Sequence, residues 1–238
     1  MSMQLRFREF IPMYIFVFSV AILLAIQTDR TVTVMSQQQP TRTVIILDAG
    51  HGGEDGGAIS CTGVEEAQIN LQITLRLDDL LHLLGYETKM LRSNQNDLHT
   101  EGTTISQRKN SDLRKRTELI NETANAVLVS IHQNQFSDSR YHGAQVFWAN
   151  TEGSQRLAED LQRAFISTLN PGSKRAAKQA KGIYIMEHIQ CTGILVECGF
   201  LSNPTEEAKL RSNEYQKKLM CVIASSICRN LYSQNPAA

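Results

Sequence analysis

A buried strand that ends in a glycine-rich loop limits the fold of this chain more than any other stretch. The apolar residues 44–47 are rich in β-branched side chains, which is typical of a strand inside a sheet. Five glycines follow between positions 50 and 57, and so many are needed only where the backbone turns tightly or is approached closely. His51 stands at the start of that loop, where open α/β sheets place their ligands. We therefore predict that His51 is a metal ligand.

The overall composition fits one globular domain of ordinary type. The chain has 238 residues, of which 42% are hydrophobic and 20% are charged, so it can bury a core. Lysine and arginine together number 24, as do aspartate and glutamate, and the formal net charge is zero. A chain without excess positive charge has no general attraction for nucleic acid, so we expect no nucleic-acid partner.

The N-terminal segment differs from the rest of the chain because it is strongly apolar. Residues 10–26 form an uncharged apolar run, short for a membrane span and long for a signal-peptide core, after two arginines. No A-x-A cleavage site follows, so we predict that residues 1–26 are a retained anchor, with a cleaved signal as the alternative. The positive flank would leave the remainder outside the cytoplasm. The polar residues 27–42 then form a linker, and residues 43–234 form the catalytic domain.

Strands and helices alternate along the rest of the chain. Helices are predicted from apolar residues at three- and four-residue steps, and strands from short β-branched or alternating runs. The predicted helices cover residues 66–84, 113–124, 154–169 and 214–231, with a short one after Asn203. The predicted strands cover residues 44–47, 87–91, 126–132, 143–148, 182–186 and 193–197. This order predicts an α/β fold with a single twisted, mostly parallel sheet and helices on both faces.

Two polar stretches are predicted to be loops. Residues 92–112 carry scattered serine, threonine and asparagine, and a surface loop of that length is often functional. The second stretch, residues 173–181, contains Lys174, Arg175, Lys178 and Lys181. A basic loop of this kind is usually only solvated, and contact with a substrate is the alternative.

Four polar side chains are predicted to meet at one edge of the sheet. His51 follows the first strand, while His132 and Glu197 each close a later one. The carboxyl ends of parallel strands lie along one edge, and Glu66, at the start of the next helix, can face the same edge. Two histidines and a carboxylate match the protein ligands of a catalytic zinc. A second carboxylate is what such a site needs as a general base.

Each of these residues has an alternative explanation when it is taken alone. A histidine at a strand end is more often incidental, and the helix dipole stabilises an acid in a first turn such as Glu66. Glu197 is different, because a carboxylate after three aliphatic residues is costly to bury unless it is paired. The glycine loop could cradle a phosphate, but no G-K-[ST] motif follows it. The grouping therefore favours a metal site.

The five cysteines offer a weaker chemical alternative. An odd number cannot pair completely within one chain, and no C-x-x-C motif indicates a thiolate zinc site. We expect mostly free thiols. Cys198 could act as a nucleophile, but it neighbours Glu197 in a strand, and neighbouring strand residues point to opposite faces.

Four motifs follow one another in order within residues 43–232. They are LDAGHGG at 47–53, Glu66 with Asn70 and Leu71, SIHQN at 130–134, and LVECGFLSN at 195–203. This series resembles the zinc-dependent N-acetylmuramoyl-L-alanine amidases of the type 3 family. The resemblance implies that His51, Glu66 and His132 hold zinc. It also implies that Glu197 is the catalytic glutamate.

Two positions depart from the family pattern. Ala49 stands where the family usually has proline, which should loosen the turn before His51. Ala67 replaces the lysine that usually follows the ligand glutamate, and Glu65 is a second acid beside that ligand. Alignment through Asn70 favours Glu66 over Glu65.

The resemblance implies hydrolysis of the amide between N-acetylmuramic acid and the L-alanine of the stem peptide in peptidoglycan. A single N-terminal apolar segment, one catalytic domain and no wall-binding repeats resemble the spore-cortex branch, which prepares muramic δ-lactam. That branch implies an extracytoplasmic protein, secreted or attached to the membrane by its N-terminal segment, in the forespore intermembrane space. A zinc carboxypeptidase acting on stem peptides and a non-catalytic cell-wall-binding protein are the alternatives. The need for an accessory protein stays open.

Overall fold

A computed structural model describes residues 42–234 of the chain. The predicted anchor or signal at 1–26, and all of the predicted linker except Arg42, lie outside the described residues. Within residues 42–234, no helix is both long enough and apolar enough to cross a membrane.

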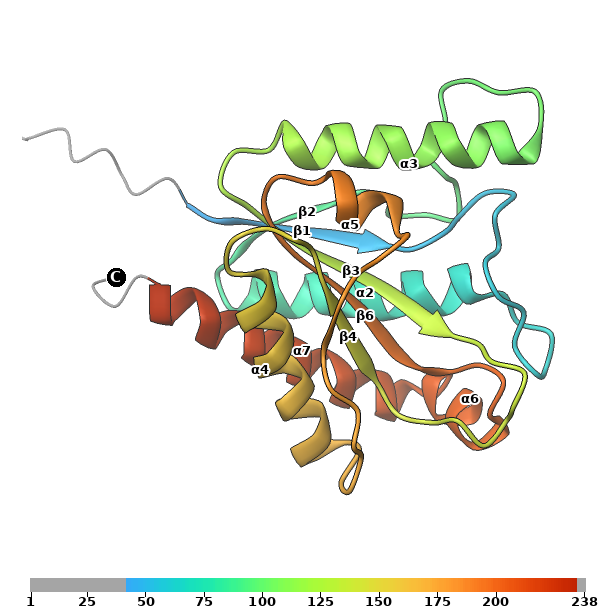
Figure 1. The fold of residues 1–238 in the computed structure, drawn as a ribbon, viewed down its shortest axis with the longest axis vertical. Coiled ribbons are helices and arrows are strands. Elements are labelled where there is room, and N and C mark those ends of the chain that lie inside the picture. The colour runs from blue at the N-terminus through green and yellow to red at the C-terminus, as the bar shows by residue number, and fades with distance from the viewer. Residues whose placement is uncertain (1–41, 235–238) are drawn as a thin grey trace, which may run out of the picture. The chain divides into compact units, whose positions relative to one another are not determined.

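The described residues form one six-stranded sheet, with the strand order β2-β1-β3-β6-β4-β5 (Figure 1). The strands are β1 (Val44–Ala49), β2 (Glu87–Met90), β3 (Ala126–Asn134), β4 (Gln145–Trp148), β5 (Lys178–Gln179) and β6 (Thr192–Phe200). β2, β1, β3 and β6 run parallel to one another, whereas β4 is antiparallel to β6 and parallel to β5. The prediction of a single, mostly parallel sheet is confirmed.

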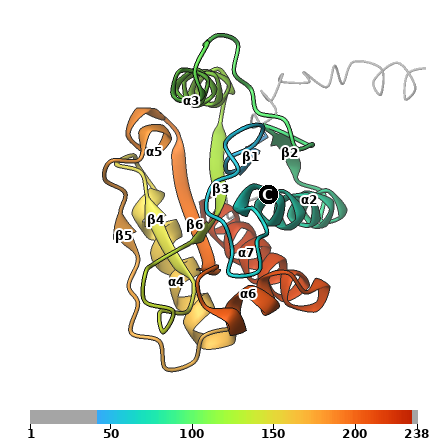
Figure 2. The ribbon, with the colours of Figure 1, turned by 90° about the vertical axis from the view of Figure 1, so that its right-hand side faces the viewer.

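Helices cover both faces of the sheet, as the alternating pattern predicts (Figures 1 and 2). One face carries α2 (Glu66–Leu83), α4 (Ser154–Thr168) and α7 (Asn213–Gln234). The other carries α3 (Ile105–Asn121) and the short α5 (Tyr184–His188). A short helix, α6 (Pro204–Leu210), follows β6. Each face has its own cluster of buried aliphatic side chains, so the central strands are fixed from both sides.

The central strands β3 and β6 extend further than predicted, and their register sets how far along the sheet each site residue lies. β3 continues to Asn134 and β6 continues to Phe200, so His132 and Glu197 lie inside their strands. The two residues are direct cross-strand partners, and the register becomes irregular just after them. Since β1 ends at Ala49, the loop that begins at Gly50 starts beside the same part of β3.

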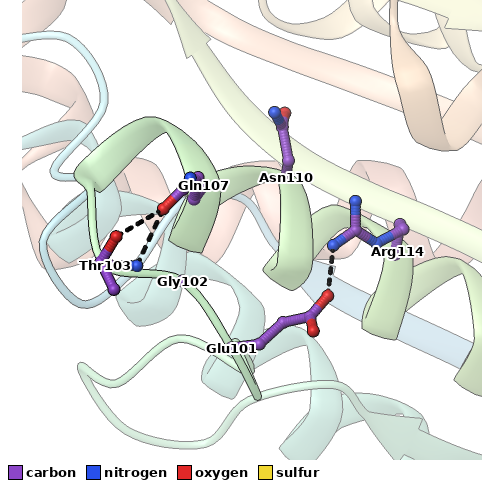
Figure 3. Close-up of a pocket in the computed structure, with 6 residues that line it drawn as sticks. All are labelled: Glu101, Gly102, Thr103, Gln107, Asn110 and Arg114. Atoms are coloured by element: carbon purple, nitrogen blue, oxygen red, sulfur yellow. Dashed lines mark hydrogen bonds and ion pairs between the residues drawn. The ribbon is translucent and has the colours of Figure 1, made fainter.

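The predicted loop at 92–112 is wrong in its second half, because α3 already begins at Ile105. Thr104 and Gln107 form a reciprocal capping box, in which each side chain accepts from the other residue's backbone N–H. Gln107 also accepts from Thr103, and the polar pocket beside these residues is shown in Figure 3. The first turns of α3 lack an apolar stripe, so hydrophobic periodicity does not reveal them. None of the predicted site residues lines this pocket.

The predicted strand at 182–186 is also wrong, since this segment contains α5. The backbone N–H of Gly182 donates to the Glu187 side chain, while Glu187 N–H donates to the carbonyl of Ile183. Ile185 and Met186 are buried against the sheet. The short apolar run fits either a helix or a strand, which explains the error. The edge strand β5 lies instead within the predicted basic loop.

Candidate metal centre

The glycine-rich loop brings its backbone against the side chains of the predicted site. His51 has a φ of 62°, in the left-handed region that few non-glycine residues occupy. A side chain at Gly50 would overlap the His132 ring. A Cβ at Gly57 would lie 2.7 Å from both Glu66 Oε2 and His51 Cδ2, and Gly57 itself has a φ of 69°. Glycine is therefore required here for close approach, as the sequence predicts.

His51, Glu66 and His132 converge at the carboxyl end of β1. His51 Nε2 lies 3.3 Å from Glu66 Oε2, and His132 Nδ1 lies 3.1 Å from Glu66 Oε1. One ligand atom from each residue lies within 4.8 Å of the others. Tetrahedral zinc with bonds of about 2.0–2.1 Å separates its ligand atoms by about 3.4 Å. The donor set and its spacing therefore fit such an ion.

Glu66 is held in place by hydrogen bonds that leave its carboxylate directed at both histidines. Its Oε1 accepts from the backbone N–H of Gln133 and from the side-chain amide of Asn70. Its Oε2 accepts from the backbone N–H of Ala58. Glu66 is buried, with 3% of its surface exposed, whereas the neighbouring Glu65 is exposed. The structure thus places Glu66, and not Glu65, in the group.

Asp55 orients the His51 ring. His51 Nδ1 donates to Asp55 Oδ2 at 2.9 Å, which directs Nε2 towards Glu66. Lys109 of α3 pairs with the same carboxylate at 2.9 Å. A carboxylate behind a histidine is the usual way to fix the tautomer and direction of a metal-binding ring. Asp55 therefore acts through His51, as a positioning residue.

Two buried arginines hold the backbone that carries His51. Arg92 donates to the carbonyls of Ala49, Gly50 and Ala67. Arg116 of α3 donates to the carbonyls of Ala49 and His51. Ala49, which stands where the family usually has proline, is fully buried. The hydrogen bonds from the two arginines hold the turn in place of that proline.

Arg116 is itself part of a buried charge network. It pairs with Asp48 at 2.5 Å and with Asp112 at 2.8 Å, and Ser130 also donates to Asp48. Burial alone would raise the pKa of Asp48, but Arg116, His132 and Ser130 together outweigh burial and keep the pKa below its ordinary value. The network links α3, β1 and β3 directly beneath the His51 loop.

The charges of the cluster shift the pKa values of its members in opposite directions. Burial would lower the pKa of His51, but hydrogen bonds to Asp55 and Glu66 outweigh burial and raise the pKa to about 9. Burial would raise the pKa of Glu66, but the two histidines hold that pKa well below its usual range. The protein itself therefore keeps Glu66 ionised and attracts one positive charge to this point.

Glu197 lies beside this group on β6, directly across from His132. Its Oε2 is buried and has no hydrogen-bond partner within residues 42–234. Burial raises the pKa of Glu197 to about 7, with a smaller opposing effect of His132. A carboxylate with a pKa near neutrality can both take up and release a proton, which is the property that a general base requires.

The cysteines do not contribute to the group. All five are unpaired in the structure, as expected. Cys198 is fully buried in the apolar cluster on the other side of β6 from Glu197. Burial raises the pKa of its thiol far above the usual range, so the nucleophilic thiolate is strongly disfavoured.

Sequence reasoning did not find Asp55 or Arg92, and it gave Arg116 and Asn70 no role in the site. Asp55 follows His51 by four residues within the glycine loop, and Asn70 follows Glu66 by one helical turn. For Asp55 that spacing is the one local signal, whereas Asn70 also belongs to one of the four motifs. The two arginines act across elements, and Arg116 is 65 positions from the His51 carbonyl that it binds.

Comparisons with known proteins agree on one family. The family model described as N-acetylmuramoyl-L-alanine amidase matches residues 45–229. A germination-specific N-acetylmuramoyl-L-alanine amidase of Bacillus subtilis (strain 168) is 36% identical over 192 residues, which cover 78% of each chain.

Solved structures of two such enzymes share the fold. One is the CwlD amidase from Clostridioides difficile in complex with the GerS lipoprotein. Its matching chain has a TM-score of 0.77 and 34% identity, and the match covers 81% of this chain and 100% of that one. The other is an N-acetylmuramoyl-L-alanine amidase from Clostridium difficile 630. It has a TM-score of 0.71 and 27% identity, and the match covers 82% of this chain and 99% of that one.

Proposed function

This chain belongs to the N-acetylmuramoyl-L-alanine amidase family, and on that basis we propose that it works with zinc held by His51, Glu66 and His132 and with Glu197 as general base. The family assignment makes it a peptidoglycan hydrolase that cleaves the amide between N-acetylmuramic acid and L-alanine. The observation that carries the finer proposal is the convergence of two histidines and one carboxylate beside Glu197, whose Oε2 is buried without a partner within residues 42–234.

Each protein group has a defined part in the proposed mechanism. Zinc in this site would supply a Lewis acid that polarises the scissile carbonyl and lowers the pKa of water from 15.7 towards about 7. Glu197 takes the proton from the attacking water and delivers it to the leaving L-alanine nitrogen. Burial favours both steps, because it raises the pKa of Glu197 towards neutrality. Asp55 holds the His51 ring through Nδ1, which leaves Nε2 directed towards the proposed zinc position.

The two alternatives from the sequence receive less support. A non-catalytic wall-binding protein has no need of the complete group or of an unpaired buried carboxylate at Glu197. A carboxypeptidase acting on the stem peptide would use similar chemistry, but all three relatives named above are amidases, and two of them are N-acetylmuramoyl-L-alanine amidases. These observations favour the amidase.

The relatives also suggest a biological setting. The Bacillus subtilis relative is germination-specific, and the Clostridioides difficile amidase was solved with a lipoprotein. We extend both features to this chain, as an enzyme of spore-cortex maturation with an accessory protein of that kind. An extracytoplasmic location, with residues 1–26 as anchor or signal, forms part of the same proposal.

Product analysis on purified sacculi tests the proposed function. The zinc-loaded protein should release stem peptides that keep their full length and begin with a free L-alanine amine, as read by mass spectrometry. A chelator should abolish release, and added zinc should restore it. Shortened stem peptides would indicate a carboxypeptidase instead. Release that persists after complete metal removal would refute the zinc assignment.

A further inference from the structure

A basic pocket opens on the surface next to the general base. It has a volume of about 570 Å³, and it lies between the segment that leads into β4 and the segment that leads into β5. Its lining includes Arg140, Tyr141, Gln145, Lys174, Arg175 and Lys178. Three of these residues belong to the basic loop whose role the sequence leaves open.

The strand register places the basic pocket beside Glu197. Gln145 of β4 is the direct antiparallel partner of Glu197 on β6. Directly opposed residues share one face of a sheet, with Cβ atoms about 4.5–5.5 Å apart. Gln145 in turn accepts a hydrogen bond from Arg175 Nη1 at 2.9 Å. One side chain thus separates the pocket from the proposed general base.

The positive charge in the basic pocket is not neutralised by the protein. Arg140 pairs with Asp138, but Lys174, Arg175 and Lys178 form no ion pair with any carboxylate in the part of the chain that the structure describes. The chain as a whole has no net charge, so this is a local excess. A pocket lined by one sign of charge concentrates ligands of the other sign.

Arg175 is already held in one orientation. Its Nε donates to the carbonyl of His142 at 2.9 Å, and its guanidinium lies over the Phe200 ring, 4.7 Å from the centroid. Its Nη2 has no hydrogen-bond partner among residues 42–234. A fixed guanidinium with free N–H groups binds a planar carboxylate with little loss of side-chain entropy.

We infer that the basic pocket binds a carboxylate of the stem peptide, on the L-alanine side of the bond that is cut. This inference rests on the proposed function, because it takes the molecule bound beside Glu197 to be a stem peptide. β5 lies two strand spacings from β6, which is about 10 Å and the length of about three extended peptide residues. The pocket therefore selects acidic stem peptides over amidated ones.

Binding measured without turnover tests this inference. The zinc-loaded Glu197→Gln protein is titrated calorimetrically with a soluble muropeptide that has free stem-peptide carboxylates, and with the same muropeptide after amidation. We expect the free acid to bind at least about tenfold more tightly. In that background, Lys174→Gln combined with Lys178→Gln should remove most of the preference, and so should raised salt, because exposed charges are screened.

Two further variants separate charge from shape and from general effects. Arg175→Lys keeps the charge but loses the planar fork, so it should weaken binding of the free acid and leave the amidated ligand unaffected. Lys181→Gln removes an equally exposed lysine of the same loop that does not line the pocket, and it should change neither affinity.

The outcomes distinguish failure of the basic pocket from failure of the proposed function. Equal affinity for both ligands in the Glu197→Gln protein, or an equal loss of both affinities when Lys174→Gln and Lys178→Gln are added, overturns the basic pocket as a carboxylate site. A clear preference for the free acid, together with a zinc-loaded parent protein that cleaves no muramoyl-alanine bond, supports the pocket and refutes the proposed function. Cleavage without any preference keeps the proposed function and refutes the pocket.

Discussion

Gly50 leaves no space for a side chain, because a Cβ there would overlap the His132 ring. Gly50→Ala should therefore displace one of the proposed ligands while leaving most of the core unchanged. We expect a large loss of bound zinc, measured by atomic absorption after dialysis, with a far-ultraviolet circular dichroism spectrum close to that of the parent. Full zinc content in this variant would show that His132 is not a ligand.

A second glycine offers a matched control for that change. Gly63 has a φ of 87° and open space around it, so Gly63→Ala introduces strain without a clash. It should lower the free energy of unfolding by about 1–3 kcal/mol and leave zinc content unchanged. Similar zinc loss in both variants would mean that backbone strain, and not contact with His132, explains the Gly50 result.

Replacing Asp55 tests whether its hydrogen bond to His51 strengthens zinc binding. Asp55→Asn keeps the shape of the side chain but weakens its hold on His51 Nδ1. Loss of such a contact typically costs 10–100-fold in metal affinity, so we expect a weakening of about that size in a competition titration with a chromophoric chelator. Glu54→Gln is the control, because Glu54 is exposed and, among residues 42–234, pairs only with Arg108 on α3. Equal affinities in the parent and Asp55→Asn would remove Asp55 from the site.

At the scale of single residues, the sequence identified the side chains whose place at the end of a strand or the start of a helix indicates a site. His51, His132 and Glu197 stand at or near strand ends, and Glu66 starts a helix, so the fold class alone brings them near one edge. Their family roles came from the resemblance of motifs. Asp55 has no such signature, since an acid in a glycine-rich loop is ordinary.

Among the predicted helices, α3 is the one whose bounds the local sequence pattern predicts least well. Ile120 is the single apolar residue among its buried ones, which are otherwise Ser111, Asp112, Arg116 and Thr117, so its first turns resemble a loop. What fixes this helix is the pairing of Arg116 with Asp48, 68 positions away. A pairing over that distance depends on the tertiary fold, and no local pattern contains it.

The same ion pair gives a prediction for α3. Arg116→Met leaves Asp48 buried without its main cationic partner, and breaking a buried pair from one side costs about 3–5 kcal/mol. Urea denaturation should show a loss of that size in the free energy of unfolding. Arg114→Met, on the exposed side of α3, should cost less than about 1 kcal/mol. Comparable losses in the two variants would show that Arg116 has no special place in the fold.

At the scale of the whole molecule, the candidate site exists only because four elements meet. His51 follows β1, Glu66 begins α2, His132 lies in β3 and Glu197 lies in β6. The alternation of elements was enough to predict one mostly parallel sheet with helices on both faces, and the structure confirms it. The antiparallel edge at β4 was not predicted, because periodicity gives no strand direction. That edge also forms one wall of the basic pocket.

The central claim is that the group of His51, Glu66 and His132 binds zinc while Glu197 moves protons. The most direct test is one preparation of Glu197→Gln protein, in which bound zinc and release of stem peptides from sacculi are measured together. We predict the zinc content of the parent and a release rate lower by about 10²–10⁴-fold, the usual contribution of a general base. Parental release with parental zinc content would contradict the account.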